Sequence, residues 1–412
     1  MQELTELQQV FLHIVKSFVQ GSTYSFPGEF DDLEQLYEMA KMHQMTAAVY
    51  EKIRRDPCCS REEYALLMSA WKRESMKEVM LQIQRTEGFL TVYEKLCNAG
   101  LKPLVVKGLV CRNLYEKPDY RISADEDLLL ERKDFGTCDR ILRQEGFQRP
   151  EPDRQHMPDE IPYINRQNGV YIELHFALFE EGAAAYGHFN REFVQVFEKS
   201  ISMEIWGKRI WTLCPTDHLF YLICHSQKHF MHSGFGIRQV CDMVLMAERC
   251  GEEISRQELW KRLERLHMQE YWEALVQIGE QYLGLSSVRT FVLESRKGKE
   301  TDCIALLQDL LEGGIYGDSS TDRRHSANMT LAAAAEGRTD MKASVKASLF
   351  PDKGYMKEHF PVLNKFPWLL APVYMLRICR YFKDHRKGMP GQSSLKLGRK
   401  RMKLLRQYGM IK

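Results

Sequence analysis

Three acidic residues in a row, Asp125, Glu126 and Asp127, stand directly before three leucines in the stretch RISADEDLLL (121–130). A buried strand normally excludes carboxylates, and a surface acidic cluster normally lies among polar residues. Successive side chains of a strand face opposite sides, so Asp125 and Asp127 share one face and Glu126 faces the other. The pattern predicts a core strand whose acidic end opens into a site.

Two carboxylates held together repel each other unless a cation lies between them. Mg²⁺ takes oxygen ligands, and proteins commonly hold it with one or two carboxylates and substrate phosphates. A third acid is available in YIELHF, where Glu173 stands between two apolar residues and His175 follows on the same face. Upstream, VVKG ends a predicted strand with Lys107 and Gly108. A bare glycine backbone lets phosphates approach closely, and the lysine can supply charge to them. Together these residues favour metal-assisted phosphoryl transfer.

This order of strand, glycine, helix, Asp-x-Asp strand and later acid resembles the nucleotidyltransferase pattern of the polymerase-β-like superfamily. VVKGLVCRNLYEKPDYRISADEDLLL (105–130) is similar, more closely, to a bacterial family of uncharacterised nucleotidyltransferases. That family reads Lys-Gly, a short helix, Arg, a polar stretch and Asp-x-Asp-Leu. GIRQVCDMVLM (236–246) and GGIYG (313–317) also resemble its helical half. The resemblance runs roughly from MHQMTAAVY (42–50) to the Pro-rich segment near residue 370.

The chain departs from the superfamily pattern at two places. Lys107-Gly108 stands where a Gly-Gly or Gly-Ser pair is usual, and the closer family shares this departure. Glu126 stands where an apolar residue is usual. Because Glu126 lies on the other strand face, we expect it to reach solvent or Arg121.

The resemblance implies an enzyme that transfers a nucleoside monophosphate from a nucleoside triphosphate, ATP among the candidates, and releases pyrophosphate. The required ion would be Mg²⁺, with Mn²⁺ as an alternative, and the acceptor would be a small molecule, a protein or an RNA. The alternative is a non-catalytic nucleotide-binding or regulatory module of the same fold, since relatives in the superfamily have lost an acid and kept the fold. The implied site residues are Asp125, Asp127 and Glu173 for catalysis and metal, Lys107, Gly108 and Arg121 for nucleotide, and His175 and His229 in the pocket.

The pattern of apolar residues along the chain, together with the family resemblance, predicts an α+β fold. It is a small mixed-sheet nucleotidyltransferase core flanked by N-terminal and C-terminal helical regions. Apolar residues at three-four spacing indicate helices, and period-two runs around Asn168-Gly169 and Gly207 indicate hairpins. The expected division is residues 1–98 helical, 99–214 the α/β core, 215–387 the helical C-terminal domain and 388–412 a basic tail that starts with the linker GMPGQSS (388–394).

The composition of the chain is that of a globular protein. With 412 residues, 44% hydrophobic and 28% charged, the chain can bury a sizeable core. The net charge of +2 gives no overall bias toward nucleic acid or membrane, but residues 377–412 hold twelve Lys and Arg against one acid, so this tail can contact an anionic surface. Eleven scattered cysteines without a CxxC pair indicate reduced thiols in a cytoplasm. No apolar run is long enough to span a membrane.

A histidine cluster follows in the helical half. His225 and His229 are one helical turn apart, and His232 is close behind. This spacing suits metal ligands, but apolar residues surround the histidines and no HExxH motif is present. We interpret them as packing or hydrogen-bonding residues, with a substrate-pocket role open for His229.

Overall fold

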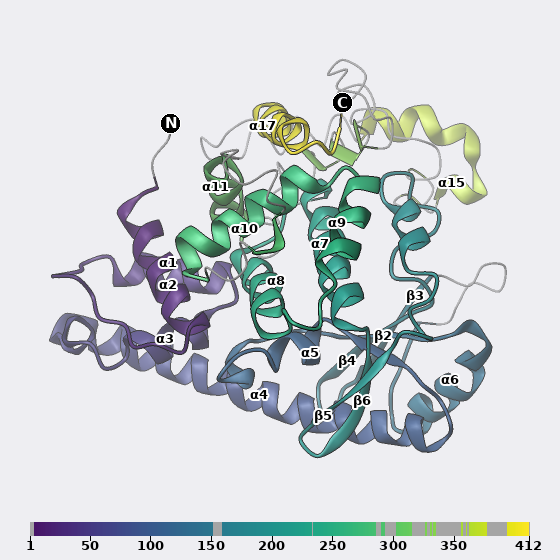
Figure 1. Cartoon of the computed structure of the whole chain (residues 1–412), viewed down its shortest axis with the longest axis horizontal. Coiled ribbons are helices and arrows are strands. Elements are labelled where there is room, and N and C mark those ends of the chain that lie inside the picture. The colour runs from purple at the N-terminus through teal and green to yellow at the C-terminus, as the bar shows by residue number, and fades with distance from the viewer. Residues whose placement is uncertain are drawn as a thin grey trace.

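The fold is organised around one mixed sheet of six strands in the order β3-β4-β2-β1-β6-β5. The computed structural model describes residues 4–150, 159–232, 234–285, 290–292, 302–314, 362–376 and 394–411, with a few single residues between 326 and 360. Helix α4 (Ala65–Asn98) runs along one side of the molecule, and α7 (Pro215–Met231) and α8 (Ile237–Arg249) lie on the other (Figure 1). This is the predicted α+β class.

Strand β2 is the central strand of the site. The strands are β1 (Leu104–Val106), β2 (Glu126–Leu129), β3 (Glu160–Asn165), β4 (Val170–His175), β5 (Ile201–Ile205) and β6 (Lys208–Thr212). β2 pairs antiparallel with β1 and parallel with β4, so these three strands are neighbours in the sheet. Both predicted hairpins form, and Gly169 and Gly207 occupy their turns with φ of 70° and 71°, a conformation that favours glycine.

Most of the remaining chain is helical. The other helices are α1 (Glu6–Val19), α2 (Leu33–Met42), α3 (Thr46–Ile53), α5 (Gly108–Arg112), α6 (Phe135–Gln144), α9 (Arg256–Arg265), α10 (Gln269–Leu283), α11 (Ile304–Gly313), α15 (Val362–Lys365) and α17 (Ser394–Gln407), with short 3₁₀ turns at 57–60, 62–64, 118–120, 132–134, 187–192 and 367–369. Thr5 begins α1 by accepting the Gln8 N–H, and Gly100 ends α4 with φ of 84°. In the part of the chain that the structure describes, no helix has the length and apolar character required to cross a bilayer.

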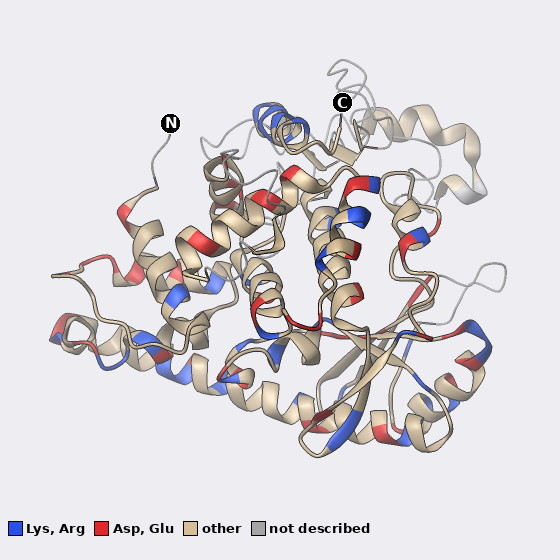
Figure 2. Cartoon of the chain, viewed as in Figure 1, with Lys and Arg blue, Asp and Glu red and all other residues tan. Residues whose placement is uncertain are grey.

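The C-terminal segment expected as a basic tail, residues 388–412, packs into the fold along its helix α17. The main hydrophobic core extends from Val10 to Ile411, and it includes Leu405 and Tyr408 of the C-terminal segment. Arg401 is fully buried, and its guanidinium donates to the carbonyl of Phe230 and, at 2.8 Å, to that of His232. The tail composition predicted only the basic outer face that Figure 2 shows on α17. Of the expected linker, residues 388–394, all but Ser394 lie outside the described residues, and Ser394 begins α17.

Replacing Arg401 with Ala should therefore destabilise the whole fold. The change removes the buried donors of two carbonyls and leaves Asp309, which is 1% exposed, without the guanidinium 4.0 Å away. We expect a loss of about 3 kcal/mol in the free energy of unfolding, measured by urea denaturation. Arg406→Ala, at an exposed position of the same helix, is the control and should change stability little. Equal stability of the two variants would contradict the packing of α17 into the core.

Candidate functional site

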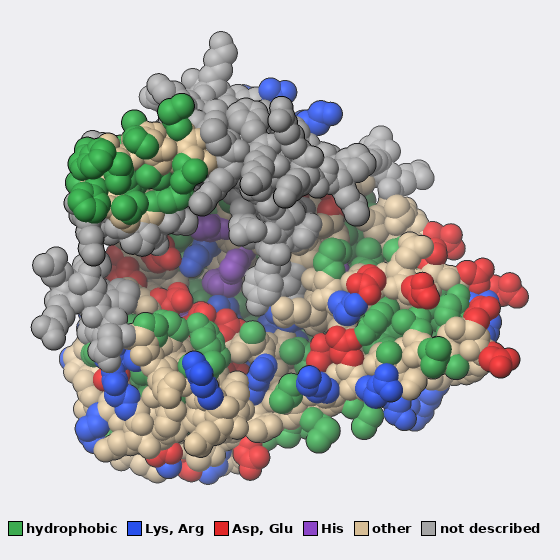
Figure 3. Space-filling model, turned by 180° about the vertical axis from the view of Figure 1, so that it is seen from behind, with side chains coloured by type: hydrophobic (Ala, Val, Ile, Leu, Met, Phe, Trp, Pro, Cys, Tyr) green, Lys and Arg blue, Asp and Glu red, His purple; other side chains and the backbone are tan. Residues whose placement is uncertain are grey.

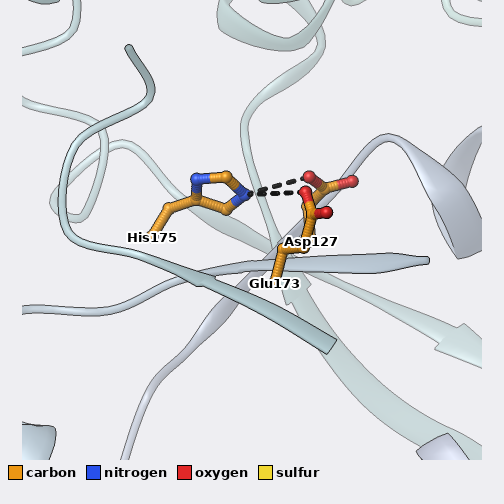
Figure 4. Close-up of side chains that lie close together, drawn as sticks. All are labelled: Asp127, Glu173 and His175. Atoms are coloured by element: carbon orange, nitrogen blue, oxygen red, sulfur yellow. Dashed lines mark hydrogen bonds and ion pairs between the residues drawn. The ribbon is translucent and has the colours of Figure 1, made fainter. Parts of the chain in front are cut away.

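The parallel pairing of β2 with β4 brings acidic residues together. Asp127 stands opposite Glu173 in the register, and strand alternation puts His175 on the same face as Glu173. His175 Nε2 lies 3.0 Å from Asp127 Oδ1 and 3.8 Å from Glu173 Oε2. One donor atom of each residue lies within 4.8 Å of the other two, and Figure 4 shows the three side chains converging. Within the described ranges this is the one set of three metal donors that converges so closely.

Lys107 supplies a positive charge beside this set. In the antiparallel pair of β1 and β2, Val106 stands opposite Asp127. Lys107, the residue after Val106, is therefore close enough for its side chain to reach the Asp127 carboxylate. Lys107 Nζ lies 2.9 Å from Asp127 Oδ1 and 3.1 Å from His225 Nε2. Its backbone N–H donates to His218 Nε2 at 3.2 Å. The φ of Lys107 is 54°, a strained value for a residue with a side chain, which persists where such contacts hold it.

The two facing carboxyl groups titrate in different pH ranges. Burial opposes ionisation of Asp127, but the Lys107 ammonium and His175 outweigh it and hold the pKa of Asp127 at about 2. Burial and the neighbouring charges of Asp127 and Glu160 raise the pKa of Glu173 to about 8. Asp127 is therefore ionised at neutral pH, and Glu173 takes up a proton near it.

Glu126 has a structural role and does not reach solvent or Arg121 as expected. Its side chain is buried on the other face of β2, where it accepts hydrogen bonds from Arg112 Nη2 at 2.6 Å and from the Leu109 N–H at 2.8 Å. A Cβ added at Gly108 would lie 2.4 Å from Glu126 Oε2. The absence of a side chain at Gly108 therefore leaves the space that the Glu126 carboxylate occupies. Nothing in the sequence distinguishes Arg112 from a solvated arginine, so this buried pair was missed.

A cavity opens between the acidic end of β2 and helices α7 and α8. It is lined by Lys107, Gly108, Arg121, Ser123, Asp125 and Asp127 from the sheet side and by Leu222, His225, Ser226, His229, Arg238, Gln239 and Asp242 from the helices. Histidine, basic and acidic side chains gather in a recess on this face of the molecule (Figure 3). The structure thus brings the predicted nucleotide residues Lys107, Gly108 and Arg121 to one cavity.

Arg121 is held in this cavity by a partner that the sequence analysis missed. Its Nε donates to Asp242 Oδ1 at 3.2 Å, and the Tyr115 hydroxyl donates to the same oxygen at 2.8 Å. Arg238 and Asp242 are four residues apart on α8, in the stretch that carries the family resemblance. That i, i+4 pair of charges within an apolar helix was the available signal.

Asp125 and the histidines of α7 and its C-terminal end are not members of the converging set. Asp125 precedes β2, is half-buried and lines the cavity, but it is outside the three-donor group, in which His175 is the third member. His225 and His229 contact each other through their Nε2 atoms at 3.2 Å. Burial and the Lys107 charge lower the pKa of His229 to about 3, so it is neutral. His232 Nε2 lies 3.3 Å from the Tyr186 hydroxyl.

The comparisons with known proteins concern the same part of the chain. The family model described as uncharacterised nucleotidyltransferase matches residues 30–284, which include every residue of the converging set and the cavity. No curated protein matches the chain. Among solved structures, the chain is similar to an antigenic nucleotidyltransferase-like protein from Paracoccidioides brasiliensis, at 13% identity over 53% of this chain and 97% of that chain. The TM-score is 0.32.

Opposite changes in stability are expected from neutralising the two facing acids. Because the pKa of Asp127 is lowered, its charge contributes stability at neutral pH that is lost as the pH falls below 3.8 and through about 2. Asp127→Asn should cost about 2 kcal/mol at pH 7. Because the pKa of Glu173 is raised from 4.5, stability falls as the pH rises from 4.5 through about 8. Glu173→Gln should remove that loss and stabilise the metal-free protein on the order of 1 kcal/mol at pH 8.

Denaturation of both variants in chelator, at pH 5 and pH 8, measures this contrast. The advantage of Glu173→Gln over the parent should grow between the two pH values, while the deficit of Asp127→Asn should stay nearly constant. A stabilised Asp127→Asn variant would show that Lys107 does not neutralise Asp127.

Gly108→Ala should destabilise the protein because the new methyl group meets a carboxylate fixed on two sides. Glu126 is held by Arg112 and by the backbone of α5, so it cannot withdraw without breaking a buried ion pair. We expect a loss of about 2 kcal/mol or more, measured as a shift in the denaturation midpoint. Gly136→Ala is the matched control, since an added Cβ there meets nothing within 4 Å. If the two alanine variants are equally stable, the account of Gly108 fails.

Proposed function

The chain belongs to the family of uncharacterised nucleotidyltransferases, and from this premise we propose that it transfers a nucleoside monophosphate from a nucleoside triphosphate to an acceptor. The observation that carries the proposal is the convergence of Asp127, Glu173 and His175 beside a cavity that also holds Lys107 and Arg121. An acceptor hydroxyl or amine attacks the α-phosphorus, and pyrophosphate leaves. The acceptor is part of a small molecule, a protein or an RNA.

A divalent cation fits the residues that are present. Asp127 and Glu173 would hold it, with His175 as a further donor and Asp125 close by at the head of β2. The convergence of donor atoms within 4.8 Å and the ionised state of Asp127 support this assignment. Mg²⁺ is the ion that the resemblance implies, and Mn²⁺ is the alternative. A bound cation would neutralise charge on the phosphates and polarise the phosphoryl group under attack.

The cavity lining supports a role in holding the triphosphate. Lys107, Arg121 and Arg238 bring three positive charges to the cavity wall, beside three carboxylates of the same lining, those of Asp125, Asp127 and Asp242. Asp242 fixes the orientation of the Arg121 guanidinium, so that arginine enters the cavity as part of a rigid pair. Such fixed charges would orient phosphate oxygens without reorganisation during the reaction. Helices α7 and α8 close the other side, where the rest of the nucleotide would lie.

One observation favours the alternative, a nucleotide-binding or regulatory module without catalysis. Lys107 Nζ lies 2.9 Å from Asp127 Oδ1, so an ammonium group already neutralises the carboxylate that a cation would use. In a module of this kind a nucleotide would bind the basic side of the cavity without a divalent cation. The two functions therefore differ in the metal requirement for nucleotide binding.

Thermal shift measurements separate the two functions. Each nucleoside triphosphate is added to the full chain with chelator, with Mg²⁺ or with Mn²⁺, and the melting temperature is recorded. Stabilisation that needs both nucleotide and cation supports the enzyme. Stabilisation by nucleotide that is the same in chelator supports the module.

Label transfer tests catalysis directly. The parent is incubated with α-labelled nucleoside triphosphates and a divalent cation, alone and with cell extract as a source of acceptors. We expect Asp127→Asn to lose transfer by at least about 100-fold, because charge stabilisation by a cation contributes several kcal/mol. Glu131→Gln, an exposed acid two residues beyond β2, should keep the parental rate. Circular dichroism must show Asp127→Asn folded at the assay temperature. Transfer by Asp127→Asn at the parental rate would refute the assignment.

A further inference from the structure

An apolar patch lies on the surface of residues 366–376, outside the part of the chain that the family model matches. The stretch FPWLLAPVYML has no charged side chain, and it forms a 3₁₀ turn over 367–369 and a helical segment over 370–376. Its exposed large apolar side chains are Trp368 at 74%, Met375 at 69%, Phe366 at 48% and Leu376 at 47%. Figure 3 shows apolar side chains gathered in one patch at the upper left, where α15 lies in that view. A contiguous exposed apolar patch marks an interaction site.

The segment is apolar on its buried side as well as on its exposed side. On the inside, Leu369, Leu370 and Tyr374 pack against a small separate core formed by Met356, Leu363 and Val373. On the outside, the Phe366 and Trp368 rings meet edge to face with their centroids 6.4 Å apart, so they form one apolar surface. A helix that is apolar all round is normally covered on every side. This segment keeps one side exposed, which favours contact with an apolar medium or partner.

Helix α17 supplies positive charge at the same end of the molecule. Its sequence, SLKLGRKRMKLLRQ, holds six Lys and Arg and no acid. Arg401 packs inward, whereas Arg399, Lys403 and Arg406 recur at three or four residues along the exposed side. Figures 1 and 2 show the segment around α15 and the basic face of α17 at one end of the molecule, away from the β5–β6 hairpin. The apolar and the basic surfaces can therefore meet the same partner.

An anionic lipid bilayer fits this combination of surfaces. Tryptophan and other large apolar side chains enter the boundary between headgroups and acyl chains, and nearby Lys and Arg are attracted to anionic headgroups. A second copy of the chain would cover the apolar patch, but a two-fold contact would bring the same positive charges toward one another. An RNA would match the charges but would leave the apolar side chains in water. The bilayer alone satisfies both surfaces.

We propose that residues 366–376 insert into the surface of an anionic membrane and that Arg399, Lys403 and Arg406 contact the lipid headgroups of the same membrane. The contact is peripheral, because the apolar stretch is too short to cross a bilayer. It goes beyond a general attraction of the basic tail to anionic surfaces, since it assigns the anchor to the apolar patch. It is independent of the proposed function, because none of these residues lines the cavity.

Co-sedimentation of the full chain with vesicles tests the proposal without any activity measurement. The vesicles contain phosphatidylcholine alone, or equal parts of phosphatidylcholine and phosphatidylglycerol. We expect binding to the mixed vesicles to be at least about tenfold tighter than to the neutral ones. Trp368→Ser should weaken binding to the mixed vesicles by about tenfold. Trp206→Ser, at an exposed tryptophan in the turn between β5 and β6, is the matched control and should bind like the parent.

A second pair of variants separates the charge contribution from the apolar one. Arg399→Gln combined with Lys403→Gln should weaken binding to the mixed vesicles by at least about tenfold at low salt, since each basic residue near the surface adds to the attraction. Added salt should weaken parental binding in the same direction. Lys72→Gln combined with Arg73→Gln removes the same charges from the exposed side of α4 and should leave binding unchanged.

Tryptophan fluorescence reports the insertion directly. Lipids with brominated acyl chains quench a tryptophan that enters the bilayer. Part of the parental emission should be quenched in mixed vesicles that contain such lipids, and Trp368→Phe should remove this quenching while Trp206→Phe keeps it.

The proposal is overturned by no binding to the mixed vesicles, by equal binding to the neutral and the mixed vesicles, or by quenching that survives Trp368→Phe. Lipid-free sedimentation gives one more such outcome. A dimer that Trp368→Ser dissociates would show that a second copy of the chain covers the patch.

Discussion

The parallel pairing of β2 with β4 is the constraint on which the rest of the site depends. Neighbouring strands lie about 4.8 Å apart, so residues opposite each other on one face are held at contact distance. Asp127 and Glu173 are such residues, so their backbone positions cannot separate without breaking the sheet. The antiparallel partner on the other side, β1, ends at Val106 and delivers Lys107 to the same carboxylate. The strained backbone of Lys107 is a local consequence of this contact with Asp127.

Two adjacent acids of β2 illustrate how strand alternation divides one sequence motif into separate roles. Glu126 faces α5, where Arg112 and a backbone N–H satisfy its oxygens in the interior. Asp127 faces the site, where a lysine and a histidine share one of its oxygens. The first acid fixes the short helix after Lys107 to the sheet, and the second lies at the chemical centre. The apolar residues that follow, such as Leu128, anchor both in the core.

The sequence predicts those parts of the fold and site that local periodicity or a turn signal determines. The opposite facing of Glu126 and Asp127 and the hairpin at Gly169 follow from such signals. The ion pairs could not be predicted from the sequence, because the tertiary packing determines which charged residues meet. Arg121 meets Asp242 across 121 positions of sequence, and no local pattern selects that acid among the many of the chain.

The choice of the third converging residue, His175, was missed for a related reason. The sequence places it on the same face as Glu173, but its distance from Asp127 depends on the register of two strands. The basic character of α17 was likewise predicted from composition. Its buried face was not predicted, because composition does not show that Leu405 lies on the side of the helix that faces the core.

The contact of Arg401 with the end of α7 also orders events during synthesis. The guanidinium that caps the carbonyl of His232 is made 169 residues after it. The helix that carries His225 can form early, because its hydrogen bonds are local, but its last turn gains its permanent donors only once residue 401 has left the ribosome. A contact so distant in sequence slows folding, since a long loop must close before the contact forms. The last turn of α7, which follows the cavity residue His229, is thus among the last parts of the molecule to gain its tertiary contacts.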